Sequence, residues 1–294
     1  MGNTAFLFCR DYFDHARPDA DFAAEHNCVA ERGGLALLFD FDAFLASGRL
    51  AVQAAEQPRT LLYRGWMLRA EQYDELYRAL RAKGYTLINS PAQYRECHHL
   101  PGWYGKLREH TAASVWTEGV PDGPGIADLL RRAGGGALIV KDYVKSRKHE
   151  WSEACHIPDA ADAERAARVV DTFVGRQEAD LVGGVVLREY LPLQMIGTHP
   201  ESGMPLAREV RVFCLRHTPF AVIQYWSGDA GELSAEASRL VEYCRVLDSN
   251  FYTVDLACRA DGRWVIMEVG DGQVSGLQDG DAARCYDNLF KLLE

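Results

Sequence analysis

Residues 252–272 read YTVDLACRADGRWVIMEVGDG, and this segment carries the strongest structural signal in the chain. Two apolar runs, Tyr252–Cys258 and Trp264–Val269, flank the dipeptide Asp-Gly at positions 261 and 262. Asp-Gly between strand-like runs is a strong hairpin signal, because a type I′ turn needs positive φ at both central residues. The segment therefore predicts an antiparallel hairpin with a two-residue loop.

Two carboxylates face each other in this hairpin. Counting outward from the two-residue loop sets Asp255 opposite Glu268. A symmetric four-residue loop would keep this pairing, and an odd-length loop would shift it by one. Opposed side chains have Cβ atoms roughly 4.5–5.5 Å apart, so two carboxylates there repel. A cation such as Mg²⁺, which binds one or two carboxylates plus substrate phosphates, would remove the repulsion. Asp271 could supply a third oxygen. The alternative is a solvated edge strand whose acids happen to face each other.

A second charged feature follows the apolar run Ala137–Val140. Lys141 ends this predicted strand, so its ammonium is expected at a sheet edge, where a phosphate could bind. The segment Tyr143–Trp151 comes next and carries Lys145 and Lys148. Several cations on a flexible connection suit a lid over a polyphosphate. The alternative is a solvated basic loop.

A further hairpin is predicted from Glu209–Leu215 and Phe220–Trp226, with its turn around residues 217–219. Arg211 lies early in the first strand. Its guanidinium could bind a phosphate or an acyl phosphate as a bidentate fork, or it could form a cross-strand salt bridge. Together with the predicted strand Val185–Glu189, these hairpins indicate an α+β region with antiparallel sheets in the second half of the chain.

The first part of the chain alternates strand and helix signals, which predicts an open, largely parallel sheet. A helix is expected over Asp21–Arg32, and a second one where Tyr73, Leu76, Tyr77 and Leu80 recur on one face. The predicted strands are Ala5–Cys9, Leu35–Phe39, Thr60–Tyr63 and Tyr85–Asn89.

Composition excludes several functional classes. The chain has 294 residues, 48% of them hydrophobic and 25% charged, and no apolar run approaches the roughly 20 residues that a membrane span needs. A formal net charge of −10 argues against a general nucleic-acid binder, whose surface is usually basic. The eight cysteines form no CxxC pair and are interpreted as reduced thiols. The N-terminus shows no basic region before its apolar stretch. We expect a cytoplasmic protein without a membrane partner.

Taken in order, these pieces resemble the ATP-grasp superfamily, and within it a clade defined by two arginines and one lysine. The segments Tyr63–Met67 (YRGWM) and Glu268–Ser275 (EVGDGQVS) carry the likeness most clearly. The resemblance implies an α+β fold in which two subdomains clasp ATP, preceded by a Rossmann-like N-terminal domain. The expected boundaries are 1–118 for the N-terminal domain, 119–183 for the small subdomain with the lid, and 184–294 for the large subdomain with the metal site.

The resemblance also implies roles for individual residues. Asp255 and Glu268 resemble the Mg²⁺ carboxylates, although Gly270 stands where many family members have Asn; Asp271 would then substitute, or a second metal ion would be held weakly. Arg211 resembles the phosphate-side arginine, and with Lys148 it is the expected catalytic group. The residues expected to bind ATP are Lys106, Lys141, Lys145, Arg188, Glu189, Tyr190 and Leu191.

The function implied is that of a ligase that phosphorylates a carboxylate to an acyl phosphate, which an amine or thiol then attacks. The alternatives are phosphotransfer to a hydroxyl and a non-catalytic nucleotide-binding module. The partner is expected to be a small-molecule or peptide carboxylate. Arg64 is the candidate for binding this anionic acceptor, with a structural ion pair as the alternative. The residues identify neither the acid nor the nucleophile, nor the oligomeric state.

Overall fold

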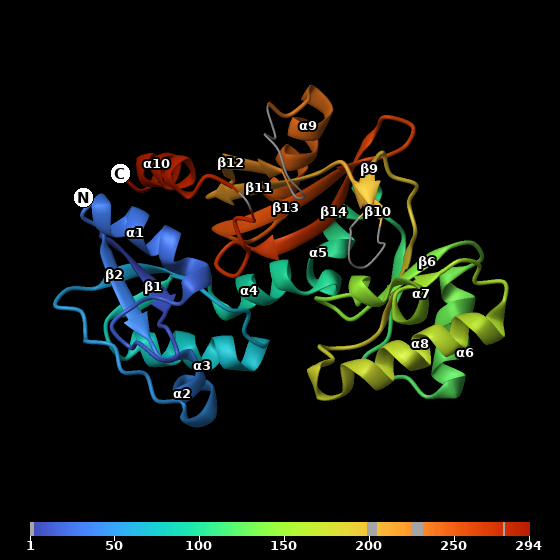
Figure 1. Ribbon diagram of the computed structural model, residues 1–294, viewed down its shortest axis with the longest axis horizontal. Helices are drawn as coiled ribbons and strands as arrows, with labels where there is room; N and C mark the ends of the chain where they lie inside the picture. Colours follow the sequence, from blue (N-terminus) through green and yellow to red (C-terminus); the bar gives the residue numbers. More distant parts are fainter. Residues whose placement is uncertain (1–2, 199–204, 225–231, 279) are drawn as a thin grey trace.

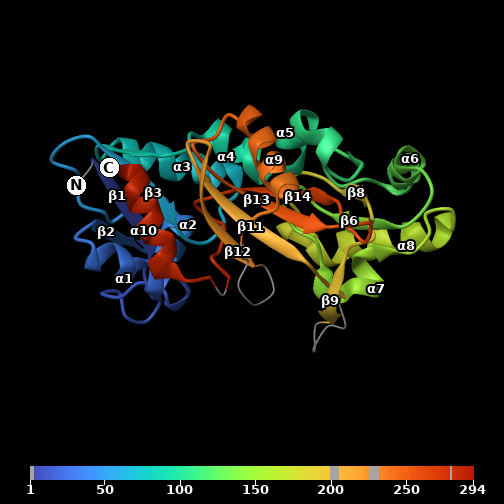
Figure 2. The same cartoon turned by 90° about the horizontal axis from the view of Figure 1, so that it is seen from above.

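The computed structural model describes residues 3–198, 205–224, 232–278 and 280–294. Within them, three four-stranded sheets and one two-stranded sheet follow one another along the molecule. Figure 1 shows a parallel sheet with both chain termini at one end, an antiparallel sheet in the middle and a smaller sheet with its helices at the other end. The view from above in Figure 2 shows the same order along the long axis.

The N-terminal sheet is entirely parallel, as the alternation of strands and helices predicted. Its order is β2-β1-β3-β4. Its apolar core includes Tyr73, Leu76 and Leu80, the predicted inner face of helix α3. The strands are β1 Thr4–Cys9, β2 Leu35–Phe39, β3 Arg59–Arg64 and β4 Tyr85–Leu87. The helices are η1 Ala20–Phe22, α1 Ala23–Glu31, α2 Phe41–Ser47 and α3 Ala70–Arg81, joined by the C-terminal α10 Ala282–Leu293.

The small sheet has the order β5-β8-β6-β7, with antiparallel pairs throughout. Both predicted domain boundaries cut this sheet, since β5 precedes residue 119 and β8 follows residue 183. Its strands are β5 Ser114–Trp116, β6 Leu138–Lys141, β7 His156–Ile157 and β8 Val186–Glu189. Its helical segments are α6 Gly123–Ala133, η3 Lys148–Glu150, α7 Trp151–Ala154, α8 Ala163–Gln177 and η4 Glu178–Asp180.

The central sheet is antiparallel, with the order β12-β11-β13-β14. Arg216 and His217 make the β11–β12 turn with φ of 48° and 63°, so the turn begins earlier than predicted. The predicted second strand ran to Trp226, and positions 225–226 lie outside the described residues. The strands are β11 Glu209–Leu215, β12 Thr218–Gln224, β13 Phe251–Cys258 and β14 Trp264–Asp271, with the separate pair β9 Met195–Thr198 and β10 Pro205–Ala207. Around it lie α4 Pro91–His98, α5 Leu100–Leu107, η2 Arg108–His110, α9 Ala235–Tyr243 and η5 Cys244–Val246.

Most of the α-helices begin at a side chain that accepts a hydrogen bond from the first turn, which satisfies an amide that has no partner inside the helix. Ser90 caps α4 in this way and is followed by proline at the first helical position. The same capping is provided by Asp40, Asp122, Asp162, Ser234 and Asp281.

The β13–β14 hairpin pairs Asp255 with Glu268, as predicted, but not through the predicted turn. Of the two turn residues only Gly262 has a positive φ, of 86°, and the Arg259 amide donates to the Arg263 carbonyl at 2.7 Å. The loop therefore has three residues, which shifts the register by one and sets Cys258 opposite Trp264. A β-bulge at position 267 shifts the register back. The type I′ turn was wrong, and the carboxylate pair is right because two shifts cancel.

A buried polar network joins the parallel sheet to the central sheet. Asn89, after β4, donates from Nδ2 to Asp271 Oδ2 at 2.6 Å and to the Phe251 carbonyl at 2.7 Å. Gln273 Nε2 donates to the hydroxyl of Tyr73 at 2.7 Å. Asp271 is fully buried, and burial raises the pKa of its carboxyl from 3.8 to about 6.

Asp271 should leave a signature in the pH dependence of stability. Because its folded-state pKa lies above its ordinary value, the folded protein binds this proton more tightly than the unfolded chain. This group's contribution to the free energy of unfolding should therefore rise as the pH falls from about 7 to about 4, by about 1.4 kcal/mol per pKa unit. Asp271→Asn should remove that rise in urea denaturation at a series of pH values.

Asp180, which is 94% exposed in its side chain, provides the control. Asp180→Asn should follow the wild-type pH profile. If Asp271→Asn also runs parallel to the wild type, Asp271 titrates as an ordinary aspartate.

Candidate active site

A cavity lies between the small sheet and the central sheet, where segments far apart in the sequence meet. Its walls come from β6, from the loop after β6, from the segment that follows β8, and from β11, β13 and β14. It brings together most of the residues predicted to bind nucleotide and metal, namely Lys141, Lys148, Arg188, Glu189, Tyr190, Leu191, Asp255 and Glu268.

Strand β6 presents Lys141 to this cavity through simple alternation. Leu138 and Val140 lie in the apolar core of the small sheet, so Ile139 and Lys141 point to the opposite face and line the cavity. Lys141 is only 5% exposed, and its Nζ donates to Glu268 Oε1 at 2.5 Å. The buried ammonium therefore bridges the small sheet and the central sheet.

Four charged side chains form one row across the sheets. Arg211 pairs with Asp255 in the strand register, and Nε and Nη2 of its guanidinium each donate to a carboxylate oxygen at 2.8 Å. Asp255 is opposite Glu268, which Lys141 binds from the other side. Each carboxylate thus has its own cation, and the expected uncompensated repulsion between Asp255 and Glu268 is wrong. The cross-strand salt bridge considered for Arg211 is present.

Asp255 and Glu268 have the chemistry of a magnesium site. Both line the cavity and offer hard carboxylate oxygens. Glu268 has a side-chain exposure of 38%, and Lys141 binds only its Oε1. Two carboxylates suffice for Mg²⁺ when substrate phosphates complete its shell. Within the described residues, no group of three or more His, Cys, Asp or Glu side chains could hold a metal ion.

The predicted third oxygen, from Asp271, is a correction. Asp271 lies three residues after Glu268 in β14, so its side chain emerges on the opposite face and binds Asn89 there. Gly270 lies two residues after Glu268. A Cβ at that position would be 2.9 Å from Thr253 Oγ1 and 3.0 Å from Ser275 Oγ, so these hydroxyls occupy the space that an asparagine would need.

The match to a family model decides what kind of protein this is. Residues 132–289 match the model described as an ATP-grasp domain, family 3 of the clade named for two arginines and one lysine. The chain belongs to this ATP-grasp family. The match covers the lysine strand, the lid segment and the carboxylate hairpin.

Solved structures with the same fold align over nearly the whole chain. The ATP-grasp ligase PsnB, in complex with precursor peptide PsnA2 and AMPPNP, has 15% identity and a TM-score of 0.60, and the alignment covers 100% of this chain and 98% of that one. The D-cycloserine synthetase DcsG has 15% identity, a TM-score of 0.63 and 99% coverage of both chains. D-alanyl-alanine synthetase A from Vibrio cholerae O1 biovar eltor str. N16961 has 11% identity, a TM-score of 0.63, and coverage of 99% and 97%. A sequence search of curated proteins gives no match.

Two predicted ATP contacts lie outside the nucleotide cavity of this ATP-grasp protein. Lys106, on α5, forms an ion pair with Glu96 and donates to the Val246 carbonyl at 3.1 Å. Lys145 lines a different cavity. Arg188 is at the predicted place, but its Nη2 donates to Thr111 Oγ1 at 2.8 Å. Its guanidinium therefore fastens β8 to the neighbouring segment.

Arg64 is a structural residue in this ATP-grasp fold, which corrects its expected role as an acceptor-binding group. It is 2% exposed, and Nε and Nη2 bind the two oxygens of Glu25 at 2.7 and 3.0 Å. Its Nη1 donates to the Gly272 carbonyl, and the hydroxyl of Tyr286 donates to Glu25 at 2.7 Å. The guanidinium is committed to partners inside the protein, so the alternative of a structural ion pair is the correct one.

Sequence reasoning missed two features of the cavity. Glu209 shares a face of β11 with Arg211 and lines the cavity, and burial raises the pKa of its carboxyl. The alternation along β11 could have revealed it. Trp151 stacks on His156, with ring centroids 4.9 Å apart, and both contact Tyr190. No local pattern signals this aromatic group, because its members come from three separate elements.

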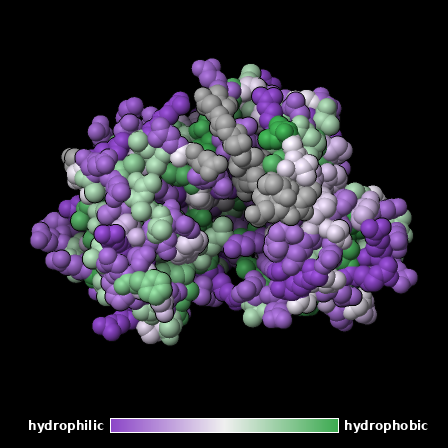
Figure 3. All heavy atoms as spheres, viewed as in Figure 1, coloured by the Kyte–Doolittle hydropathy of each residue, from purple (hydrophilic) through white to green (hydrophobic). Residues whose placement is uncertain are grey.

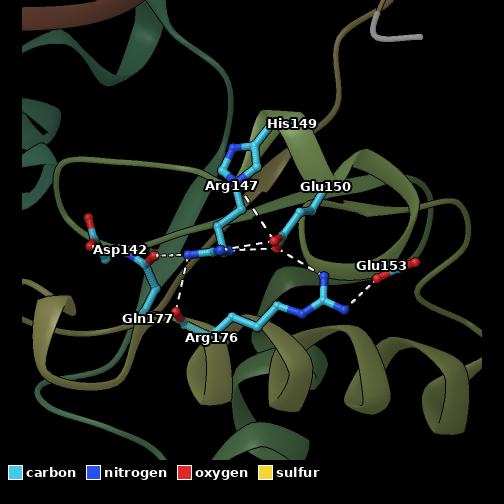
Figure 4. Close-up of polar contacts among 7 residues, drawn as sticks. All are labelled: Asp142, Arg147, His149, Glu150, Glu153, Arg176 and Gln177. Atoms are coloured by element: carbon cyan, nitrogen blue, oxygen red, sulfur yellow. Dashed lines mark hydrogen bonds and ion pairs between the residues drawn. The ribbon is translucent and has the colours of Figure 1, made fainter. Parts of the chain in front are cut away.

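The predicted lid, Tyr143–Trp151, is tied to helix α8 by the network in Figure 4. Arg147 binds both oxygens of Glu150, at 2.6 and 2.9 Å, and donates to Gln177 Oε1 at 2.9 Å. Arg176 binds Glu150 from the other side at 2.9 Å. The hydrogen bond from Arg147 is the main cause that lowers the pKa of Glu150 to about 2. The nucleotide cavity is only about 130 Å³, whereas ligand pockets usually have roughly 300–1,000 Å³, so ATP has to part these walls.

Replacing Arg147 should loosen the lid. Hydrogen bonds to charged groups contribute about 1.5–3 kcal/mol, so Arg147→Met should accelerate amide hydrogen exchange in residues 143–151 about tenfold or more. Mg-ADP should slow that exchange again. Arg168→Met removes an exposed ion pair with Glu164 on the same helix and is the matched control. Exchange that is equally slow in both variants would show that the network does not hold the segment.

The buried pair can be tested by stability. Arg64→Met leaves the carboxylate of Glu25 buried without its cation, which should cost about 3–5 kcal/mol in urea denaturation. Adding Glu25→Gln should recover part of this loss. As a control, Arg78→Met breaks an exposed pair with Asp74 and should change stability by less than about 1 kcal/mol. A normally stable Arg64→Met variant would restore the acceptor-binding role.

Proposed function

We propose that this ATP-grasp protein is an ATP-dependent ligase that joins a carboxylate to an amine or thiol through an acyl phosphate. The observation that carries the proposal is the row Arg211–Asp255–Glu268–Lys141, which brings two carboxylates and two cations together in one cavity between the sheets. The relatives named above as ligases or synthetases support it through the shared fold.

The chemistry needs charge neutralisation more than proton transfer. An oxygen of the acid attacks the γ-phosphorus of ATP, the bond to the bridging oxygen breaks, and ADP leaves with the electron pair. The amine or thiol then attacks the acyl carbon, loses its proton, and phosphate departs. Lys141 and Lys148 are placed to bind the phosphates, with Arg211 beside them. Mg²⁺, held by Asp255 and Glu268, would supply further positive charge at the transferring group.

The adenine is proposed to lie on the segment that follows β8. Glu189, Tyr190 and Leu191 line that side of the cavity, and Ile139 and Met267 provide apolar surface there. Apolar walls with a few polar groups are typical of sites for small molecules.

The organisation of the chain supports further parts of the proposal. The parallel sheet is proposed as the Rossmann-like N-terminal domain, and the small subdomain is proposed to include β5 and β8 because they pair within its sheet. A cytoplasmic location is proposed on the eight cysteines, all of which are free and buried. Among the described residues, no helix is long and apolar enough to cross a membrane.

Hydroxylamine trapping tests the ligase proposal. It replaces the natural nucleophile and converts an acyl phosphate to a hydroxamate, so a mixture of carboxylic acids with Mg-ATP should yield ADP, phosphate and hydroxamate in equal amounts. Glu268→Gln removes a metal ligand and should lower this rate about a hundredfold or more while weakening Mg-ADP binding less. Glu242→Gln, exposed on α9, is the control and should react normally. A phosphorylated hydroxyl product would identify a phosphotransferase, and tight ATP binding without turnover a non-catalytic module.

A further inference from the structure

A second cavity, of about 700 Å³, lies where the parallel sheet meets the loop after β14. One wall is made of residues that follow β1, β2 and β3 in the chain, including Phe22, Phe41 and Trp66. The strands are parallel, so these residues gather at the carboxyl edge of the sheet. The order β2-β1-β3 places neighbours of β1 on both sides, and ligands in open α/β sheets bind at this kind of switch point.

One guanidinium separates this cavity from the nucleotide cavity. Arg211 Nη1 donates at 3.1 Å to the carbonyl of Gly276, which lines the second cavity. The other face of the same guanidinium binds Asp255, which lines the first. A group in the second cavity can therefore approach the phosphate end of the nucleotide site past Arg211.

Donors for an anion are present at this end. Lys145 is exposed, lines the second cavity, and its ammonium makes no hydrogen bond or ion pair with the part of the chain that the structure describes. The backbone amides of Gly276 and Leu277 also donate to no acceptor within the described residues. Of the two acids in the walls, Glu25 is neutralised by Arg64, and Asp21 is solvent-exposed.

The rest of the cavity is apolar and aromatic. Trp66 and Met67 are among the large hydrophobic residues that remain exposed, and Trp66 is 41% exposed. Trp66 packs edge-on against Phe22, with ring centroids 5.4 Å apart, and donates from Nε1 to Asp19 at 3.2 Å, so its position is fixed. Figure 3 shows apolar side chains on the parallel-sheet end of the molecule, beside a hollow in this face.

We infer that this second cavity binds the acceptor acid and that it selects a monocarboxylate with an apolar or aromatic body. The inference rests on the proposed ligase function. Lys145 binds the carboxylate beside Arg211 instead of binding ATP, and Trp66 and Met67 cover the body of the acid. A second carboxylate on the acceptor would lie against these apolar walls without a partner, which disfavours small dicarboxylates.

Calorimetric titration in the presence of Mg-ADP tests the acid class without requiring turnover. The probes are N-acetyl-phenylalanine, N-acetyl-glycine and succinate. N-acetyl-phenylalanine should bind at least tenfold more tightly than the other two. Trp66→Ala should remove most of this preference. Equal binding of the three acids, or tighter binding of succinate, would overturn the selectivity.

A matched pair of lysines on one loop tests the assignment of Lys145. Lys145→Gln should weaken N-acetyl-phenylalanine about tenfold and leave the affinity for Mg-ADP within twofold, and Lys145→Arg should restore the acid. Lys148→Gln, whose side chain lines the other cavity, should show the reverse pattern. Unchanged acid binding in Lys145→Gln, or a loss confined to Mg-ADP, would overturn the assignment.

The two proposals fail in different ways. If N-acetyl-phenylalanine binds as expected but no acid yields ADP or hydroxamate, the ligase function is wrong and the carboxylate site remains. If other acids yield hydroxamate while N-acetyl-phenylalanine does not bind, the ligase function remains and the second cavity is not the site of an apolar acceptor.

Discussion

The register of the β13–β14 hairpin determines what the rest of the molecule can do. Side chains alternate between the two faces of a strand, so a slip of one residue moves a whole set of side chains to the other face. Asp255 faces Glu268 only because the odd loop around Gly262 and the bulge at position 267 cancel each other. Loss of either one alone would separate the two carboxylates, and with them the cations Arg211 and Lys141 that meet them from β11 and β6.

Buried polar contacts divide the molecule into a fixed part and a part held by reversible contacts. The parallel and central sheets are joined by Arg64 with Glu25 and by Asn89 with Asp271, all of them buried. Removing one partner from such a contact leaves an unsatisfied buried group, which is costly. The small sheet meets the central sheet largely across the nucleotide cavity, where Lys141 supplies an ion pair. Parting the walls for ATP is therefore expected on this side, since the other junction resists it.

Local sequence patterns predicted the elements and failed where a residue's role depends on a distant partner. The alternation of apolar residues reproduced β2 and β11 to the residue, because strand periodicity is a local property. The role of Arg64 could not be read in this way, because Glu25 lies 39 positions away and only the fold brings the two together. Asp271 is a different case: an odd separation from Glu268 along one strand already indicates opposite faces, so its exclusion from the metal site was open to counting.

The ion pair between Lys141 and Glu268 has a consequence for how ligands load. In the structure each of these groups completes the other, so the carboxylate is a stand-in for phosphate and the ammonium a stand-in for metal. A phosphate that draws Lys141 away leaves Glu268 unpaired and ready for a cation, and a cation on Glu268 releases Lys141 for a phosphate. The first partner to arrive meets the full strength of the internal pair, and the second does not. Metal and nucleotide are thereby thermodynamically coupled, and each raises the affinity for the other.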